Sequence, residues 1–196
     1  MRGHLFLLIG PSGSGKTTLI REVHARLPIV RFIPTTTTRP PRPSEVNGRE
    51  YFFASPEEFD RLVDRGDLLE WQWVHGNRYG TSRIRFQEAV DQGVLGITSI
   101  DVLGGVAVKG AFPDVSTSIF VRPSSLAELK RRLVARGDTP GEDMKRRLAR
   151  SEMEIVQAKR CDRILINDDG RLETAVVGLL EIIQPFLPAQ QTTSAD

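Results

Sequence analysis

Cysteine and histidine are scarce in this sequence. It has one cysteine, Cys161, and its three histidines, His4, His24 and His75, do not have the spacing of metal ligands. A single cysteine excludes an internal disulfide and any multi-cysteine metal site, and it suits a reducing compartment. We therefore interpret Cys161 as a small core residue, and we predict no zinc site and a cytoplasmic location.

Long apolar stretches and an excess of one charge are also missing. No run approaches the roughly 20 apolar residues of a membrane span, and the short run at residues 5–9 leads into a glycine-rich turn, unlike a signal peptide. The 27 Lys and Arg against 25 Asp and Glu leave a net charge of +2. That balance predicts neither nucleic acid nor membrane as a partner. The 196 residues, 39% of them hydrophobic, are enough for one compact domain with subdomains or two small ones.

A glycine-rich stretch, GPSGSGKTT at residues 10–18, follows the apolar run. The run is typical of a buried strand, and residues behind the stretch share one face of a helix, namely Leu19, Ile20, Val23 and Leu27. Strand, glycine turn and helix give the G-x-x-x-x-G-K-[ST] pattern the context that it requires. An ordinary glycine turn is the alternative, but every position of the pattern is filled.

The chemistry of this pattern predicts a nucleoside triphosphate site. Glycines let the backbone curl around a phosphate with several N–H groups pointing inward, and the helix N-terminus adds its positive end. We expect Lys16 to reach the outer phosphates and the Thr17 hydroxyl to be a ligand of Mg²⁺. The predicted ATP-binding residues of the loop are Gly10, Pro11, Ser12, Gly13, Ser14, Gly15, Lys16, Thr17 and Thr18.

Predicted strands alternate with predicted helices along the rest of the chain. This indicates an α/β fold with a mostly parallel sheet that is covered on both faces. Strands are expected at residues 29–33, 51–53, 68–74, 94–100, 115–121 and 164–166, and loops at 35–48 and 75–81. Helices are expected after Ser55 and after Ser125, each with a glutamate three residues later that completes a capping box. Further helices are expected near 82–91, from 104, from 142 to about 160, and at 172–183, where Pro185 follows.

Composition divides this chain into parts. A core of the P-loop NTPase type is predicted at residues 1–34, 96–136 and 161–187, with an inserted acceptor-binding α+β subdomain at 35–95. The helix-breaking glycine and proline residues at 137–141 predict the start of a helical lid at 137–160. The polar residues 188–196 are predicted to be a disordered tail.

A phosphate loop predicts a triphosphate site but not the reaction, so the arginines matter. Arg39 and Arg42 lie in the predicted insertion, and Arg136 and Arg147 flank the joint before the lid. Guanidinium groups neutralise the charge of a transferred phosphoryl group with paired hydrogen bonds. Each arginine taken alone is better interpreted as a surface residue. Their joint presence favours phosphoryl transfer.

Further stretches are similar to guanylate kinases, in the order in which that family has them. The likeness runs from about residue 4 to about residue 180 and covers nearly the whole chain. It rests on TTRPPR at 37–42, EVNGREY at 45–51, LEW at 69–71, GNRYGT at 76–81, IDV at 100–102, LVARG at 133–137, RL at 147–148 and NDD at 167–169. The resemblance implies transfer of the γ-phosphoryl group of ATP to GMP, giving ADP and GDP, with Mg²⁺.

The resemblance also implies roles for individual residues. The phosphate of GMP would be held by Arg39, Arg42, Tyr51 and Tyr79, and its base would be read by Glu70, Thr35 and Thr81. The transferred phosphoryl group would be surrounded by Lys16, Arg39, Arg136 and Arg147. Asn167 would lie near the adenine of ATP, and Asp101 near the acceptor nucleoside and the metal.

The chemistry of Glu70 agrees with the role that the resemblance implies. Guanine presents N1–H and N2–H₂ as neighbouring donors that a buried carboxylate accepts, while threonine hydroxyls donate to O6. Adenine would turn a bare N1 lone pair toward the carboxylate, and sites built on hydrogen bonds reject such analogues by roughly 10⁴–10⁵ in favourable cases. From the residues alone, a solvent-facing strand position for Glu70 is an equally good interpretation.

Three functions therefore stay open: a guanylate kinase, a P-loop kinase of a different phosphorylated acceptor, and a non-enzymatic guanylate-kinase-like module that binds peptides. The intact phosphate loop disfavours the module, and Glu70 together with Thr35 and Thr81 disfavours a sugar phosphate. Ser99 stands where the family usually has an aspartate, which bears on Mg²⁺ affinity and turnover. Monomer and homodimer are both compatible with the sequence.

Overall fold

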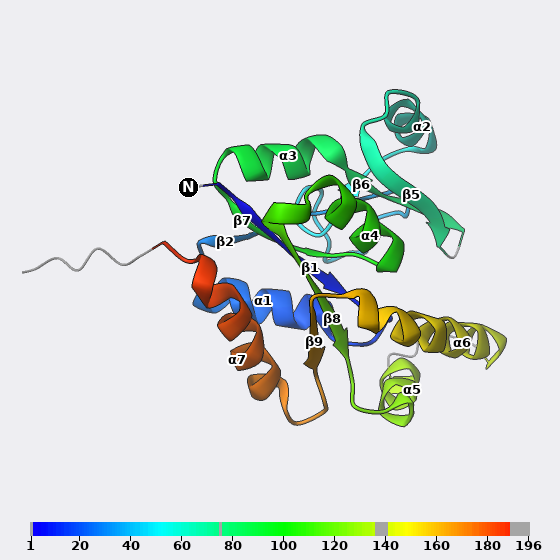
Figure 1. Ribbon diagram of the computed structural model, residues 1–196. Helices are drawn as coiled ribbons and strands as arrows, with labels where there is room; N and C mark the ends of the chain where they lie inside the picture. Colours follow the sequence, from blue (N-terminus) through cyan, green and yellow to red (C-terminus); the bar gives the residue numbers. More distant parts are fainter. Residues whose placement is uncertain (1, 75, 136–140, 189–196) are drawn as a thin grey trace, which may run out of the picture.

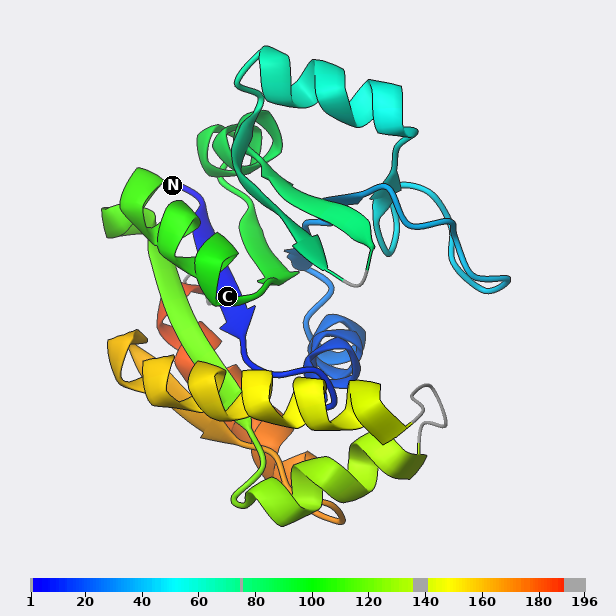
Figure 2. The same cartoon turned by 90° about the vertical axis from the view of Figure 1, so that its right-hand side faces the viewer.

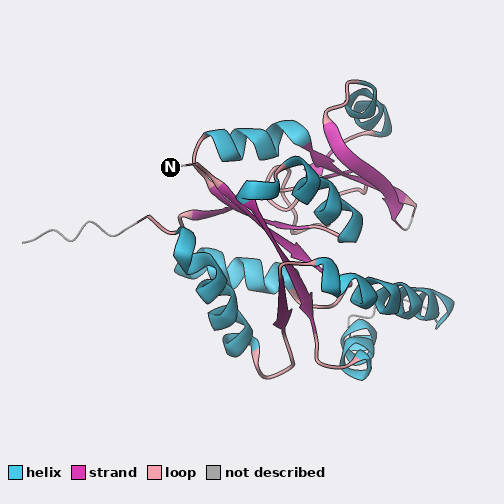
Figure 3. Ribbon diagram, viewed as in Figure 1, coloured by secondary structure: helices cyan, strands magenta, loops and turns pink. Residues whose placement is uncertain are grey.

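The computed structural model describes residues 2–74, 76–135 and 141–188. Its centre is a sheet of five parallel strands in the order β2–β7–β1–β8–β9 (Figures 1 and 3). The strands are β1 (His4–Ile9), β2 (Val30–Phe32), β7 (Leu95–Ser99), β8 (Ser116–Arg122) and β9 (Arg163–Ile166). The predicted α/β fold with a parallel sheet is confirmed.

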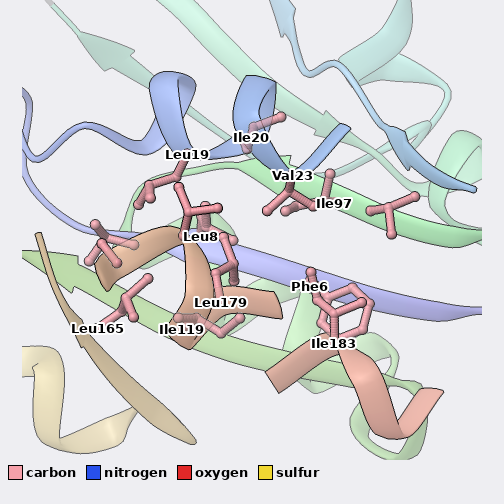
Figure 4. Close-up of a cluster of buried hydrophobic side chains, with 14 of the residues drawn as sticks. Phe6, Leu8, Leu19, Ile20, Val23, Ile97, Ile119, Leu165, Leu179 and Ile183 are labelled. Carbon is pink, nitrogen blue, oxygen red and sulfur yellow. The ribbon is translucent and has the colours of Figure 1, made fainter. Parts of the chain in front are cut away.

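The central strand β1 is apolar from Leu5 to Ile9 because both of its faces are buried. Successive side chains of a strand point to opposite faces. Phe6 and Leu8 therefore belong to one hydrophobic cluster, whereas Leu5, Leu7 and Ile9 belong to another on the opposite face. Figure 4 shows the first of these clusters, with Leu8 near its middle and Phe6 beside Ile183.

Helices cover both faces of this sheet (Figures 1 and 2). Packed on the first cluster are α1 (Lys16–Arg26) and α7 (Leu172–Ile183), and packed on the second are α3 (Arg83–Asp91) and α4 (Val102–Ala111). The other helical elements are α2 (Pro56–Asp64), α5 (Leu126–Ala135), α6 (Gly141–Gln157) and the 3-10 turns η1 (Pro113–Val115), η2 (Ala158–Arg160) and η3 (Gln184–Phe186). Among the described residues, no helix is both long enough and apolar enough to cross a membrane.

A second sheet of four strands comes between β2 and β7 in the chain. Its order is β4–β3–β6–β5, with β3 (Thr36–Thr37), β4 (Phe52–Phe53), β5 (Leu68–Val74) and β6 (Asn77–Ser82). Arg78 joins this sheet to α2, since its guanidinium donates to the Pro56 carbonyl at 2.6 Å and lies 4.7 Å from the ring centroid of Phe59. The division into core, subdomain and lid stays a prediction; α3, inside the range predicted for the subdomain, contacts β1 and β7.

Two segments predicted to be loops contain strands. β6 occupies most of the predicted loop at 75–81, and β3 lies within the one at 35–48. β6 pairs antiparallel with β5, from Asn77 opposite Val74 to Ser82 opposite Leu68, and β3 pairs with both β4 and β6. Gly76, Asn77 and Gly80 favour a turn locally. Strand partners from elsewhere in the sequence override that preference.

Of the two predicted capping boxes, the structure has one in full. At the start of α2, the Ser55 hydroxyl accepts the Glu58 N–H, and the Glu58 carboxylate accepts the Ser55 N–H. At the start of α5, the Ser125 hydroxyl accepts the Glu128 N–H at 3.2 Å. The Glu128 carboxylate, however, has other partners, so the second box is only half formed.

His4 is built into the sheet in its neutral form. Its Nε2 lies 2.8 Å from the Thr117 hydroxyl, and its ring stacks on Phe186 with 3.9 Å between centroids. Burial lowers the pKa of His4 to about 4; the charge of Lys109 adds to this effect and that of Asp162 opposes it.

His4→Phe is expected to reduce the loss of folding stability that occurs as the pH falls below neutral. The pKa of His4 in the folded chain lies below its ordinary value of 6.5, so the unfolded chain binds more protons between the two values. The stabilisation that comes from keeping His4 neutral is therefore fully present above about pH 6.5, and it is lost as the pH falls toward about 4. In thermal unfolding, the variant should lose less Tm than the wild type between about pH 7 and about pH 5. Parallel curves would contradict a buried neutral histidine.

Candidate active site

Several of the predicted site residues follow the carboxyl ends of parallel strands. Because parallel strands end at the same edge of a sheet, segments that follow them lie there together. The glycine-rich loop follows β1, Asp101 follows β7 and Asn167 follows β9. The pairing of β1 with β7 and β8 thus brings together parts of the chain that are far apart in sequence.

The glycine-rich loop has the backbone of an anion site. Three of its glycines have positive φ: Gly10 (142°), Gly13 (85°) and Gly15 (92°), the last being the N-cap of α1. Gly10 also has no room for a side chain, because a Cβ there would lie 2.2 Å from the Val121 carbonyl oxygen. The Lys16 ammonium donates to the carbonyls of Gly10 at 2.6 Å and Pro11 at 2.9 Å. Its positive charge therefore lies over the loop.

Thr17 fits a magnesium ion beside that loop. It lies in the first turn of α1, and its side chain is exposed. Mg²⁺ in phosphoryl-transfer sites needs few protein oxygens, because water and substrate phosphates fill most of its positions. Ser99 ends β7, and Asp101 is the N-cap of α4, where its Oδ1 accepts the Gly104 N–H at 2.9 Å. The Thr17 hydroxyl at the start of α1, with the oxygens of Ser99 and Asp101 at the same edge of the sheet, is a donor set that fits Mg²⁺.

Asn167 supports the phosphate loop. Its buried side chain donates from Nδ2 to the Ser14 carbonyl at 2.8 Å. A Cβ at Gly15 would come within 2.2 Å of that same Nδ2, so glycine is required there by contact as well as by φ. The sequence did not indicate this support. The contact of Asn167 with adenine, implied by the resemblance, stays a prediction.

The Glu70 carboxylate points into the protein, toward α4. Its Oε1 accepts the Thr81 hydroxyl at 2.7 Å, and a Cβ at Gly104 would lie 3.1 Å from the same oxygen. Burial raises the pKa of Glu70 to about 7; the hydrogen bond from Thr81 opposes the rise and the charge of Asp101 adds to it. The solvent-facing interpretation of Glu70 is therefore wrong.

The second oxygen of Glu70 lacks a partner. Within the described residues, Oε2 is the one buried side-chain polar atom that has no hydrogen bond. An unsatisfied buried polar atom costs roughly 1–3 kcal/mol, a cost that a hydrogen-bond donor at this oxygen would remove. Thr35, also assigned to base reading, is buried one residue before β3, and its carbonyl accepts the Phe52 N–H at 2.9 Å.

Arg39 lies close to Tyr51 and Tyr79, the two tyrosines that the resemblance assigns with it to the phosphate of GMP. Its guanidinium carbon is 5.5 Å from the ring centroid of Tyr51, and the rings of Tyr51 and Tyr79 are 6.0 Å apart. Its Nη2 donates to both carboxylate oxygens of Glu45 at 2.8 Å. Glu45 was not among the predicted site residues, although it lies in one of the stretches that resemble the family. It orients Arg39 beside the tyrosines.

Of the other three arginines of the prediction, only Arg42 is placed beside this cluster by the described contacts, and its charge acts on both Glu45 and Tyr51. The side chain of Arg42 is exposed, while its backbone N–H donates to Glu45 at 2.8 Å. Arg136 lies outside the described residues, and Arg147 lies on α6 with its side chain outside the description. Convergence of the arginines on a phosphoryl group stays a prediction.

The two tryptophans lie on the strand that carries Glu70. Trp71 and Trp73 of β5 are 41% and 62% exposed. They point away from Glu70, because alternate residues of a strand face opposite sides. Trp71 contacts Phe59 of α2 with 6.2 Å between ring centroids, and the Arg78 guanidinium lies 5.7 Å from the Trp73 ring.

Comparison with known proteins identifies the family. The guanylate kinase family model matches residues 2–185. The chain is 40% identical to a guanylate kinase of Thermotoga maritima over 184 residues, covering 94% of this chain and 87% of the relative, and 43% identical to one of Symbiobacterium thermophilum over 182 residues, covering 93% and 85%. A crystal structure of guanylate kinase from Anaplasma phagocytophilum matches with a TM-score of 0.73 and 28% identity, over 94% of this chain and 86% of that one. The chain therefore belongs to the guanylate kinase family of nucleoside monophosphate kinases.

Proposed function

We propose that this chain transfers the γ-phosphoryl group of ATP to GMP, giving ADP and GDP, in a reaction that requires Mg²⁺. The observation that carries the choice of acceptor is the Glu70 carboxylate, whose Oε2 is buried without a hydrogen bond in the described structure. Guanine supplies N1–H and N2–H₂ as two adjacent donors, which match the two oxygens of one carboxylate. Adenine has no such pair on that edge.

The phosphate of GMP would be bound by Arg39 with the hydroxyls of Tyr51 and Tyr79. Glu45 keeps the Arg39 guanidinium beside the two rings, so little ordering is left for the moment of binding. Arg42 would join from its exposed position. The remaining acceptor contacts are proposed for Thr35, Thr81 and Asp101.

The triphosphate would lie in the glycine-rich loop, with Lys16 over its outer phosphates and Asn167 on the adenine side. Bound through the Thr17 hydroxyl and phosphate oxygens, Mg²⁺ would neutralise charge on the transferred group. Lys16, Arg39, Arg136 and Arg147 would share that charge. Catalysis by such residues is positioning and electrostatic stabilisation without a covalent intermediate.

The proposal includes closure of two parts of the chain over the substrates. Residues 35–95 would close on GMP, and a lid at 137–160 would bring Arg147 in and exclude water that would otherwise hydrolyse ATP. We also propose a cytoplasmic location, with either a monomer or a homodimer as the active form.

The test is a coupled ADP-release assay with Mg-ATP and each of GMP, AMP, CMP and UMP. GMP should be used with a kcat/KM at least about 10³-fold above that of AMP, because AMP leaves the Glu70 carboxylate without its donors. Removal of Mg²⁺ with a chelator should stop the reaction, and added Mg²⁺ should restore it. If the chain does not phosphorylate GMP but does phosphorylate another acceptor, the assignment is refuted.

A further inference from the structure

Glu128 is a buried carboxylate that the proposed reaction does not use. It lies in the first turn of α5 and is only 8% exposed. Its Oε1 accepts two hydrogen bonds, from Arg132 Nη2 at 2.5 Å and from the Asp169 backbone N–H at 2.6 Å. Arg132 Nε in turn donates to Asp169 Oδ1 at 2.7 Å. These residues close a ring of charge-assisted hydrogen bonds between α5 and the turn that follows β9.

The same turn, at residues 167–169, is attached to the phosphate loop. Asn167, two residues before Asp169, donates to the Ser14 carbonyl at 2.8 Å. Asp168 between them accepts the Ser124 N–H at 2.7 Å, which fixes the turn to the segment that precedes α5. The turn is thus held on one side by the phosphate loop and on the other by α5 and its approach.

α5 also contacts the phosphate loop directly. Leu129 and Leu133 are buried and lie against Gly13, where a Cβ would come within 3.4 Å of a Leu129 methyl and 3.2 Å of a Leu133 methyl. The loop therefore has two supports: α5 at Gly13, and the turn at Ser14. The ring around Glu128 joins these two supports, in addition to the hydrogen bond between Ser124 and Asp168.

We propose that Glu128 is a positioning residue for the ATP half of the site. It holds α5 and the turn at 167–169 in one arrangement, and through them it fixes the curvature of the phosphate loop. Without the carboxylate, the Arg132 guanidinium and the Asp169 N–H lose their shared acceptor, and, among the described contacts, the two supports are held together only by the Arg132–Asp169 and Ser124–Asp168 hydrogen bonds. The GMP half lies on the second sheet and does not depend on this ring. The inference rests on the proposed function only for the identity of the nucleotide.

Glu128→Ala and Glu128→Gln test the proposal, with Glu58→Ala as the matched control. Glu58 is the other glutamate three residues after a serine N-cap, but it lies on α2, against the second sheet. Glu128→Ala should raise the dissociation constant of ADP, measured by calorimetry, and the KM for ATP by about tenfold, equivalent to about 1.4 kcal/mol. The KM for GMP should stay within about twofold. Glu128→Gln should be intermediate, because its amide oxygen still accepts the Asp169 N–H.

The control separates positioning from general stability. Glu58→Ala should lower Tm through loss of its capping bond without changing the ADP or ATP constants. Equal changes in the KM for ATP and for GMP, or a fall in Tm alone, would overturn the role of Glu128. If Glu128→Ala does not fold, Glu128→Gln decides through the same ADP titration, and an unchanged constant overturns the proposal. A wild-type chain that binds ADP but ignores GMP would refute the proposed function and leave this test valid.

Discussion

Lys16→Ala is expected to lower kcat for GMP phosphorylation by about 10³-fold, one of the two largest losses that we expect from a single substitution. The Lys16 ammonium lies over the phosphate loop, 2.6 Å from the Gly10 carbonyl, where it would face the outer phosphates of ATP. Alanine removes that charge at the point where negative charge develops. Steady-state rates at saturating Mg-ATP and GMP measure the effect, and the KM for GMP should change little.

A surface lysine provides the control for this result. Lys159 lies in η2 with an exposed side chain, so Lys159→Ala changes the net charge by the same amount and should leave kcat within about twofold. Retention of more than about a tenth of kcat by Lys16→Ala would show that the loop lysine is not part of the catalytic machinery.

Glu70→Gln is expected to lower kcat/KM for GMP by about 10³-fold while leaving ADP binding unchanged. In the structure Oε2 is buried and open to a donor, and an amide at this position would turn N–H groups toward the N–H groups of guanine. The loss should appear in initial rates at low GMP. Exposed Glu57 on α2 gives a matched control, Glu57→Gln, which should behave as wild type.

The same Glu70→Gln substitution is expected to stabilise the free protein above neutral pH. Because burial raises the pKa of Glu70 from 4.5 to about 7, the protonated acid is favoured by folding. That stabilisation is complete below about pH 4.5 and is lost as the pH rises through about 7. Glutamine resembles the protonated acid, so the variant should be more stable by on the order of 1–2 kcal/mol at about pH 8, allowing for partial exposure. The difference should vanish near about pH 4.5.

GMP binding should have the opposite dependence on pH. Guanine donors require the carboxylate, so the wild-type KM for GMP should rise as the pH falls below about 7. The Glu70→Gln variant should lack that dependence. A variant that is less stable than the wild type at about pH 8 would contradict the raised pKa of Glu70. A variant with normal use of GMP would contradict the assignment of Glu70 as the residue that reads the base.

The sequence predicted best those elements whose signals are local. The strand before Gly10 and the helix after Gly15 follow from an apolar run, a glycine pattern and a helical face, and the box at Ser55 needs only residues 55–58. β6 was missed, because Asn77–Ser82 has turn-forming residues and becomes a strand only through pairing with β5. Pairing of that kind depends on distant residues and leaves little trace in composition.

In the candidate site, too, features with a local sequence signal were predicted and features that depend on distant residues were not. The phosphate loop was legible from spacing alone, whereas the direction of Glu70 was not, because strand alternation permits either face. Two side chains were misjudged or overlooked for a common reason. Glu128 fits a capping box by position, and Glu45 resembles a surface charge in a polar loop. Their actual partners, Asp169 and Arg39, are identified only once the chain has folded.

Both tryptophans of this chain, Trp71 and Trp73, stand on the strand that holds Glu70. The indole fluorescence of the protein therefore originates entirely from the sheet proposed to receive GMP, and none of it from the phosphate loop. Because both indoles point away from Glu70, a change in emission reports a change in that sheet and not contact with the base. The fold thereby provides an intrinsic optical signal for movement of the second sheet, without a dye.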